Sequence, residues 1–381
     1  MQRYDVLVVG GGISGVSVAY ELAADRSVGL IDMESVLAFH TSGRSLATFL
    51  ESYGGPVIRA LTTGSREALE NPPDIMEPPL LSPLGLLWLG PQGQSNLIHG
   101  LHDAVRDLVP DVQIVSGSEA EEINPALAKG YTEIGMFEPG ATSIDVNALH
   151  QGYVKGVRRL GGEVRVSTKL VSAERKGSIW RVKDSAGNEY EAETIVNAAG
   201  SWVDEVAEIC GAKPVGIRPL RRTVFLVSAP ADLSLQGIPL TGNIENTWYF
   251  MPQGEFFACS PADETLMEPC DAKPDPLEIA RALEAINEAT ILKARSIKSP
   301  WAGLRNFVPD GVPVVGYDEV AEGFFWYAGQ GGYGMQIAPA LSKTAVALID
   351  GLPIPEDLVA RGLKAEDISA SRPGMSHFAG H

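Results

Sequence analysis

Residues 1–32 constrain the fold more than any other part of the chain. An unbroken apolar run from Asp5 to Gly10 indicates a strand that is buried on both faces. The loop Gly10-Gly-Gly-Ile-Ser-Gly15 follows, then a helical pattern over 16–24 and a second apolar strand over 28–31. Asp32 ends that strand, about twenty residues beyond the second glycine. This order predicts a strand–loop–helix–strand unit that binds the ADP part of NAD or FAD.

The glycine loop combines residue types that each have a physical task. Gly10 permits a tight turn, Gly12 lets the backbone approach a pyrophosphate, and Gly15 lets the helix pack closely on the sheet. The start of the helix presents unpaired N–H groups and a partial positive charge to the phosphates. The carboxylate of Asp32 can accept hydrogen bonds from a ribose diol. The unit does not by itself distinguish NAD from FAD.

Composition excludes several classes of protein. The 381 residues are 45% hydrophobic and 20% charged, which is typical of a globular protein of about two domains. The net charge of −18 opposes binding to nucleic acids and anionic lipid surfaces. The chain has three cysteines, no metal-ligand spacing and no apolar run of about 20 residues. We therefore expect a cytoplasmic protein with no metal, no nucleic-acid partner and no membrane insertion.

Helix and strand patterns divide the remainder of the chain between two regions. Helices are expected over 57–70, 97–108, 146–160, 276–289 and 335–349. Short strands over 163–190 are expected to form a small sheet packed on the nucleotide-binding region, and Pro252-Gln-Gly254 predicts a hairpin. The expected fold is α/β with mixed α+β character. It comprises a Rossmann-like domain of residues 1–80, 141–215 and 300–381 and an interleaved antiparallel-sheet domain of residues 81–140 and 216–299.

Three further motifs accompany the glycine loop: Asn197-Ala-Ala-Gly200, Gly303–Gly311 and Gly329-Gln-Gly-Gly-Tyr-Gly334. With these motifs in this order, the chain resembles the D-amino-acid oxidase, glycine oxidase and sarcosine oxidase superfamily of FAD enzymes. It looks most similar to bacterial D-arginine dehydrogenases, through the stretches His40–Ser45, Leu149–Tyr153, Trp301–Arg305 and Glu322–Trp326. The resemblance implies an FAD domain assembled from separated segments. It also implies oxidation of an amine to an imine, which water then hydrolyses to a 2-oxo acid and ammonia.

The resemblance also implies which residues hold FAD, and it implies non-covalent binding. The last glycine-rich turn opens a helix, whose N-terminus would stabilise negative charge on a reduced flavin. Some sarcosine and dimethylglycine dehydrogenases bond FAD covalently through a histidine in the loop of His40, so that alternative stays open. The expected cofactor residues are Gly10, Gly12, Ile13, Ser14, Gly15, Asp32, Met33, Thr41, Gly43, Arg44, Ser45, Thr48, Val171, Ala199, Gly200, Trp202, Gly303, Gly331, Gly332, Tyr333, Gly334, Met335 and Gln336.

An amino-acid substrate brings a carboxylate, which the fork of an arginine can bind through two parallel hydrogen bonds. Arg305 and Arg222 match the carboxylate-binding arginines of the superfamily. Tyr53 and Tyr249 resemble tyrosines that hydrogen-bond the substrate, and Gly332 completes the expected catalytic set. The motifs do not identify the electron acceptor, which is oxygen, a quinone or another molecule.

The expected side-chain pocket consists of Thr48, Leu50 and Leu87. D-arginine dehydrogenases carry a histidine in place of Thr48 and an acidic residue in place of Leu87. An apolar residue cannot pair a buried guanidinium, and burying that charge unpaired is costly. We therefore expect a D-amino acid with a small or apolar side chain to be preferred over D-arginine.

Three alternatives remain open at this point. A glycine, sarcosine or other N-methyl amino-acid oxidase would keep the flavin and change the substrate. An NAD(P)-dependent dehydrogenase would share the first unit but would not require the later glycine turns at Asn197 and Gly329. A flavin-bearing interaction or electron-transfer subunit would not require Arg222 and Arg305.

Overall fold

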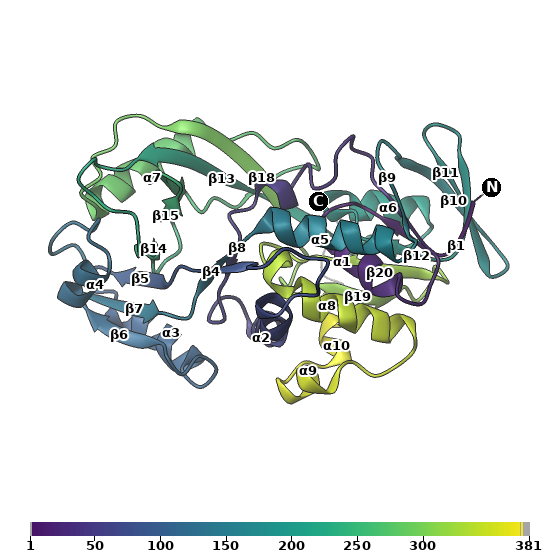
Figure 1. Cartoon of the computed structure of the whole chain (residues 1–381), viewed down its shortest axis with the longest axis horizontal. Helices are drawn as coiled ribbons and strands as arrows, with labels where there is room; N and C mark the ends of the chain where they lie inside the picture. The colour runs from purple at the N-terminus through teal and green to yellow at the C-terminus, as the bar shows by residue number, and fades with distance from the viewer. Residues whose placement is uncertain (1, 374, 376–381) are drawn as a thin grey trace.

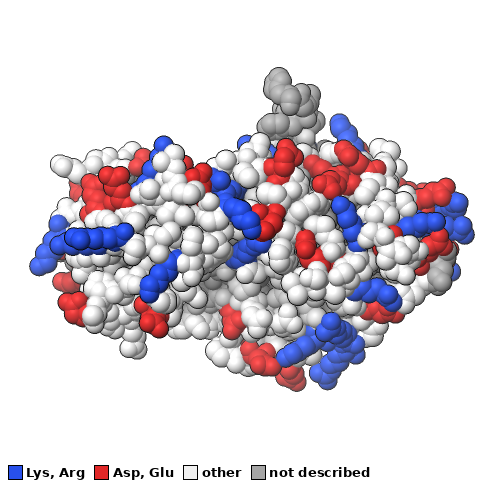
Figure 2. Space-filling view, turned by 90° about the horizontal axis from the view of Figure 1, so that it is seen from above, with Lys and Arg blue, Asp and Glu red and all other residues white. Residues whose placement is uncertain are grey.

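The computed structural model describes residues 2–373 and 375. Two large sheets lie at opposite ends of the molecule, and segments from all parts of the chain alternate between them (Figure 1). The face shown in Figure 2 carries acidic and basic side chains side by side. No helix among the described residues is long and apolar enough to span a membrane.

The first sheet has a parallel centre, in the order β9-β2-β1-β12-β20. Antiparallel strands extend it: β19 pairs with β20, and β10 and β11 continue from β12. The strands over 163–190 therefore belong to the main sheet, and the expectation of a separate small sheet was wrong. The eight strands are β1 (Gln2–Val9), β2 (Val28–Ile31), β9 (Glu163–Arg165), β10 (Leu170–Lys176), β11 (Ile179–Asp184), β12 (Glu189–Asn197), β19 (Val314–Tyr317) and β20 (Phe324–Ala328).

Strand β1 is buried on both faces, as predicted. Val6 and Val8 pack into one hydrophobic cluster, whereas Leu7 and Val9 pack into another on the opposite face. The helices α1 (Ile13–Leu22), α5 (Val146–Arg159) and α8 (Gly334–Ile349) contribute to the first cluster, and α6 (Val203–Ile209) contributes to the second. The side chain of Asp145 caps α5 by accepting a hydrogen bond from the Ala148 N–H.

The second sheet is mainly antiparallel and includes the hairpin predicted at Pro252-Gln-Gly254. Strand β18 pairs with β13 along most of its length, so this sheet continues to Phe307, although the sequence assigned residues from 300 onward to the first domain. The strands are β5 (Leu86–Gly90), β6 (Gln113–Ser116), β7 (Ile134–Glu138), β13 (Arg218–Ser228), β14 (Leu240–Asn243), β15 (Tyr249–Gln253), β16 (Phe256–Ser260), β17 (Thr265–Leu266) and β18 (Lys298–Phe307).

Short elements connect the two sheets and complete the fold. A three-stranded sheet, β3-β8-β4, lies between them (Figure 1). Its strands are β3 (Thr48–Phe49), β4 (Leu81–Pro83) and β8 (Thr142–Ile144). The remaining helices are η1 (Ser42–Arg44), η2 (Gly200–Trp202), α2 (Pro56–Glu70), α3 (Ser95–Val105), α4 (Gly117–Ile123), α7 (Pro276–Ala289), α9 (Glu356–Ala360) and α10 (Ala365–Ile368).

Candidate active site

A large cavity lies at the carboxyl ends of β1, β2 and β12 and continues past β18 to the start of α8. Ligands of open α/β sheets bind at this edge of the strands. The empty volume of the cavity is about 1850 Å³, which includes the open space at its mouth. The cavity runs from the glycine loop after β1 at one end to Arg222 and Arg305 at the other.

The glycine loop after β1 forms one end of the cavity. Gly10 has a φ of +111°, and a Cβ there would lie 2.4 Å from the carbonyl oxygen of Ala198. A Cβ on Gly15 would lie 1.8 Å from the carbonyl oxygen of Gly10, so α1 packs directly on the loop backbone. Gly12 lines the cavity, and the nearest neighbour of a Cβ there would be the Ser42 hydroxyl at 3.2 Å. This geometry suits the turn, the close packing and the phosphate approach that were assigned to the three glycines.

Asp32 lies at the end of β2 and lines the same end of the cavity. Its carboxylate accepts hydrogen bonds from the N–H of Gly11 at 2.5 Å and the N–H of Glu34 at 2.8 Å. Burial raises the pKa of Asp32, and these two donors partly offset that effect. Each carboxylate oxygen has a further lone pair, so Asp32 can still accept from a ribose hydroxyl.

The residues at this end fit the ADP part of FAD. Ile13 N–H donates to Ser42 Oγ at 2.9 Å, which positions the start of α1 against the cavity wall. Gly12 and Ser14 line the cavity at the positive end of the helix, where a pyrophosphate is stabilised. An acidic side chain for the ribose and a glycine backbone for the phosphates are therefore both in place.

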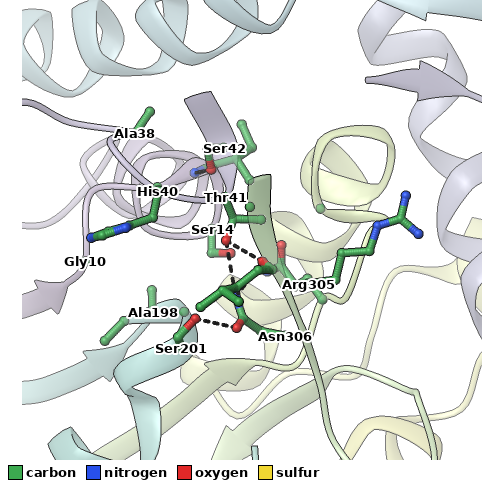
Figure 3. Close-up of a pocket in the computed structure, with 18 of the residues that line it drawn as sticks. Gly10, Ser14, Ala38, His40, Thr41, Ser42, Ala198, Ser201, Arg305 and Asn306 are labelled. Carbon is green, nitrogen blue, oxygen red and sulfur yellow. Dashed lines mark hydrogen bonds between the residues drawn. The ribbon is translucent and has the colours of Figure 1, made fainter. Parts of the chain in front are cut away.

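His40 lies at the nucleotide end of the cavity. Its ring packs against that of Trp202, with 4.6 Å between centroids, and its Nε2 lies 2.9 Å from Glu34 Oε1. Figure 3 shows His40 and the guanidinium of Arg305 on opposite sides of the pocket.

A hydrogen-bonded chain joins the walls of the cavity (Figure 3). Ser201 donates to Asn306 Oδ1 at 2.6 Å, Asn306 Nδ2 donates to Thr41 Oγ1 at 3.4 Å, and Thr41 donates to the carbonyl of Leu304 at 2.6 Å. The chain connects η2, the loop before η1 and β18. Thr41 was expected from the sequence, whereas Ser201 and Asn306 were not, although Asn306 lies inside the Gly303–Gly311 motif and Ser201 directly follows the Asn197–Gly200 motif.

The last glycine-rich turn leads from β20 into the 16-residue helix α8. Gly331, Gly332 and Gly334 line the cavity at the positive end of this helix. Gln330 also lines the cavity, and although its side chain is buried, neither its amide nitrogen nor its amide oxygen has a partner among the described residues. Buried polar atoms are normally hydrogen-bonded, so this amide is a candidate contact for the flavin, which the sequence analysis did not identify.

Arg222 and Arg305 converge because of strand register. Antiparallel pairing places Arg222 of β13 opposite Gly303 of β18 and places Arg305 opposite Leu220. The two arginines are therefore diagonal neighbours on one face of the sheet. A Cβ on Gly332 would lie 2.7 Å from Arg305 Nε, so a larger residue there would displace the arginine side chain from its position beside the glycine turn.

Both arginines lie in a pocket that has few compensating charges. Arg222 Nη2 donates to Glu264 at 2.8 Å, but its buried Nε and Nη1 atoms have no partner among the described residues. Burial and the charge of Arg305 lower the pKa of Arg222. For Arg305, burial lowers the pKa, but the neighbouring hydroxyls of Tyr53 and Tyr249 outweigh it and the net shift is upward. A ligand carboxylate would supply the missing hydrogen-bond acceptors and the missing negative charge.

Most of the expected site residues line this one cavity. Those that do so are Tyr53, Arg222, Tyr249, Arg305, Gly10, Gly12, Ile13, Ser14, Asp32, Met33, Thr41, Arg44, Ser45, Thr48, Ala199, Gly200, Trp202, Gly303, Gly331, Gly332, Gly334, Met335 and Gln336. The guanidinium of Arg44 also donates hydrogen bonds to the Ala302 carbonyl at 3.0 Å and to Asp271 at 2.6 Å. The first of these bonds connects η1 to β18. Gly15 and Gly43 do not line the cavity. A Cβ would lie 1.8 Å from a backbone carbonyl oxygen at Gly15 and 2.3 Å from one at Gly43.

Leu87 and Leu50 are not part of the cavity lining. Leu87 is fully buried on the far face of β5, in a cluster with Phe225 and Phe250. Leu50 is buried in another cluster, beside Trp88. Neither leucine therefore contacts a substrate in this cavity, and the expectation that Leu87 forms the side-chain pocket was wrong.

Two expected cofactor residues also lie outside the lining. The side chain of Val171 is exposed, whereas Thr168, Lys169 and Leu170 line the cavity next to it. The ring of Tyr333 packs on that of the lining residue Tyr53, with 5.3 Å between centroids, so Tyr333 contacts the substrate end of the cavity through Tyr53.

Comparisons with known proteins agree with this arrangement. Residues 5–348 match the model of the DAO family, the FAD dependent oxidoreductases. Glycine oxidase of Bacillus licheniformis is 25% identical over 96% of this chain and 98% of its own length. The crystal structure of glycine oxidase from Geobacillus kaustophilus has a TM-score of 0.81 at 20% identity and covers 92% of this chain and 96% of its own. L-alpha-glycerophosphate oxidase from Mycoplasma pneumoniae with FAD bound also has a TM-score of 0.81, at 17% identity, with 92% and 95% covered.

The family match spans the glycine loop, the arginine pair and the start of α8, which are the three parts that the geometry brings together. The expected superfamily, mixed α/β fold and cofactor are confirmed. The chain belongs to the DAO family of FAD-dependent oxidoreductases.

Proposed function

We propose that the protein oxidises the amine of a small amino acid to an imine, which water hydrolyses to a 2-oxo acid and ammonia. The preferred substrates are D-amino acids with small or apolar side chains. Bound FAD supplies the acceptor for the hydride that leaves the carbon next to the amine. The D configuration is supported by the sequence resemblance alone.

The observation that carries the proposal is the arginine pair at the flavin end of the cavity. Arg222 has two buried nitrogen atoms without an acceptor among the described residues, and Arg305 lies over Gly332 just before α8. A substrate carboxylate held by both guanidiniums would be fixed in position and orientation, which is most of what hydride transfer requires of a protein. An amine on the neighbouring carbon would then lie between the arginines and the flavin.

The same arginines favour the reactive protonation state of the substrate. An amine can lose a hydride from its α-carbon only when it is neutral, and nearby positive charges lower the pKa of an ammonium group. The site therefore promotes loss of the ammonium proton without a dedicated base. Turnover should increase with pH across the range in which the bound amine deprotonates.

The side-chain preference is supported by the lining close to the arginines. Leu46, Thr48 and Val224 line the cavity together with Tyr53 and Tyr249. Glu264 is a carboxylate close to the arginine pair but outside the cavity lining, and Arg222 Nη2 already donates to it at 2.8 Å. A guanidinium side chain would have to compete with Arg222 for this partner, so a small or apolar side chain fits better.

Anaerobic flavin bleaching tests the proposal. The purified protein would be mixed with D-amino acids, their L-enantiomers, glycine, sarcosine and glycerol 3-phosphate, and its visible absorbance followed. Rapid bleaching by D-leucine or D-alanine, with slower bleaching by D-arginine, is the expected result. Faster reduction by D-arginine or by an L-enantiomer would overturn the proposed specificity, and reduction by glycerol 3-phosphate alone would overturn the amine chemistry. Readmitted air would then distinguish an oxidase from a dehydrogenase.

Oxidation of glycine or an N-methyl amino acid is the second candidate. It is favoured by the likeness to two glycine oxidases over more than nine-tenths of the chain. Such substrates present the same carboxylate to Arg222 and Arg305 but leave the side-chain space empty. Bleaching by glycine or sarcosine at a higher rate than by any D-amino acid would select this candidate.

A further inference from the structure

We propose that His150 is a positioning residue for the cofactor, because it orients a peptide group of the glycine loop. His150 lies on α5, far along the chain from the loop, and its side chain is 2% exposed. Its Nε2 lies 3.0 Å from the carbonyl oxygen of Gly11. Neither the family match nor the expected site residues assign it a role.

The partners of His150 determine its tautomer. The Gly11 carbonyl can only accept a hydrogen bond, so Nε2 carries the proton and donates. The side-chain nitrogen of Gln151, an amide donor, lies 3.3 Å from Nδ1, so Nδ1 accepts. Burial lowers the pKa of His150, which further favours this neutral form.

The bond to His150 determines the direction of a potential phosphate donor. In a planar trans peptide, the carbonyl of one residue and the N–H of the next point in opposite directions. Because the Gly11 carbonyl points toward α5, the Gly12 N–H points away from α5, toward the cavity that Gly12 lines. His150 thus aims a backbone donor at the place where the pyrophosphate approaches.

The preceding peptide group is fixed in the same manner. The Gly11 N–H donates to Asp32 at 2.5 Å, and the Gly10 carbonyl on the other side of that peptide faces Gly15 of α1. The Gly11 carbonyl has a second donor, the Ala38 N–H at 3.2 Å. Two successive peptide planes are therefore held by Asp32 and His150, and loss of His150 would leave the second plane with the longer bond alone.

The test measures binding of FAD to the refolded or FAD-depleted protein, by quenching of flavin fluorescence, together with the unfolding midpoint of the apoprotein. His150→Leu removes the donor but keeps a buried apolar side chain. His150→Gln places an amide N–H at about the reach of Nε2, whereas the shorter His150→Asn does not reach Gly11. Tyr153→Leu is the matched control, because Tyr153 is also buried on α5 but packs on Tyr20 and does not bond the loop.

We expect the FAD dissociation constant to rise about tenfold in the Leu and Asn variants, the effect of one lost hydrogen bond to a partly buried acceptor. The Gln variant should bind FAD within about twofold of the wild type. The Tyr153→Leu variant should unfold at a lower temperature but bind FAD normally. Wild-type affinity in His150→Leu, or equal loss in the Gln and Leu variants, would show that His150 serves only to fill the core. Since the readout is FAD affinity, the result does not depend on the substrate.

Discussion

The two ends of the cavity are built differently. At the nucleotide end, the glycine loop presents its backbone to the cavity, and the peptide groups of Gly11 already have protein partners in Asp32 and His150. At the substrate end, the polar groups include side chains from β13, β18 and the loop before α2, and two buried nitrogens of Arg222 have no partner in the part of the chain that the structure describes. The nucleotide end is thus preorganised by its own hydrogen bonds, whereas the substrate end becomes complete only when an anion binds.

Because of this difference, substitutions at the two ends should impair different properties of the protein. A substitution at the substrate end should alter reaction rates and leave FAD in place, and a substitution at the nucleotide end should alter FAD affinity.

Arg305→Met should lower kcat/KM for the best substrate by roughly 10²–10³-fold, because a buried charge-assisted contact to the carboxylate is lost. The visible spectrum and FAD content should stay as in the wild type. Stopped-flow reduction and the flavin-to-protein ratio would measure both. Arg281→Met, on the exposed side of α7, is the control and should have no effect. If Arg305→Met lost its FAD instead, the two ends could not be treated as separate.

Gly12→Ala should weaken FAD binding by about 10- to 100-fold, because the added methyl group occupies the space that the pyrophosphate approaches. The apoprotein should remain as stable as the wild type, since a Cβ at Gly12 meets only the Ser42 hydroxyl at 3.2 Å. Fluorescence titration with FAD and thermal unfolding of the apoprotein would test this. Gly100→Ala, in α3 with open space around its Cβ, serves as the control. An unstable Gly12→Ala apoprotein with normal FAD affinity would contradict the prediction.

Glu264→Gln should lower KM by a few-fold and leave kcat unchanged. Glu264 holds Arg222 through one hydrogen bond but is half-exposed, so solvent weakens the pair and the gain on removing its charge is modest. Steady-state kinetics on the best substrate would measure the change. An increase in KM would mean that Glu264 contacts the substrate amine directly.

Protonation of His150 should destabilise the fold at acidic pH. Because burial lowers its pKa in the folded state, the unfolded chain binds the proton more readily below the ordinary value of 6.5. The contribution of His150 to stability is therefore complete above pH 6.5 and is lost as the pH falls. Urea unfolding at several pH values should show a steeper acidic loss for the wild type than for His150→Gln. Identical pH profiles would mean that the pKa of His150 is the same in the folded and the unfolded chain, which would contradict this prediction.

The contrast between the two ends also explains what could be predicted from the sequence. The nucleotide end depends on residues that are neighbours in the chain, so the glycine spacing and Asp32 could be identified directly. Arg222 and Arg305 were found only through the resemblance, because their meeting depends on the register of β13 and β18.

The sequence analysis placed Leu87 and Val171 wrongly and missed His150, and each error has a physical reason. Strand β5 is apolar at every position and buried on both faces, so no alternation indicates which way Leu87 points. Val171 differs from the lining residue Leu170 by a single step along a strand. A lone histidine among apolar residues, such as His150 beside Leu149, is typical of a core position, and only the structure brings it to Gly11.

The most direct test of the account compares the best D-amino acid with its carboxamide. The two molecules share the amine and the side chain and differ in the group that Arg222 and Arg305 are proposed to bind. Flavin reduction would be followed anaerobically at saturating and subsaturating concentrations of each. We predict that the carboxamide reduces the flavin at least about 100-fold less efficiently, with most of this difference lost in Arg305→Met. Equal reduction by the acid and the carboxamide would contradict the proposed role of the arginine pair.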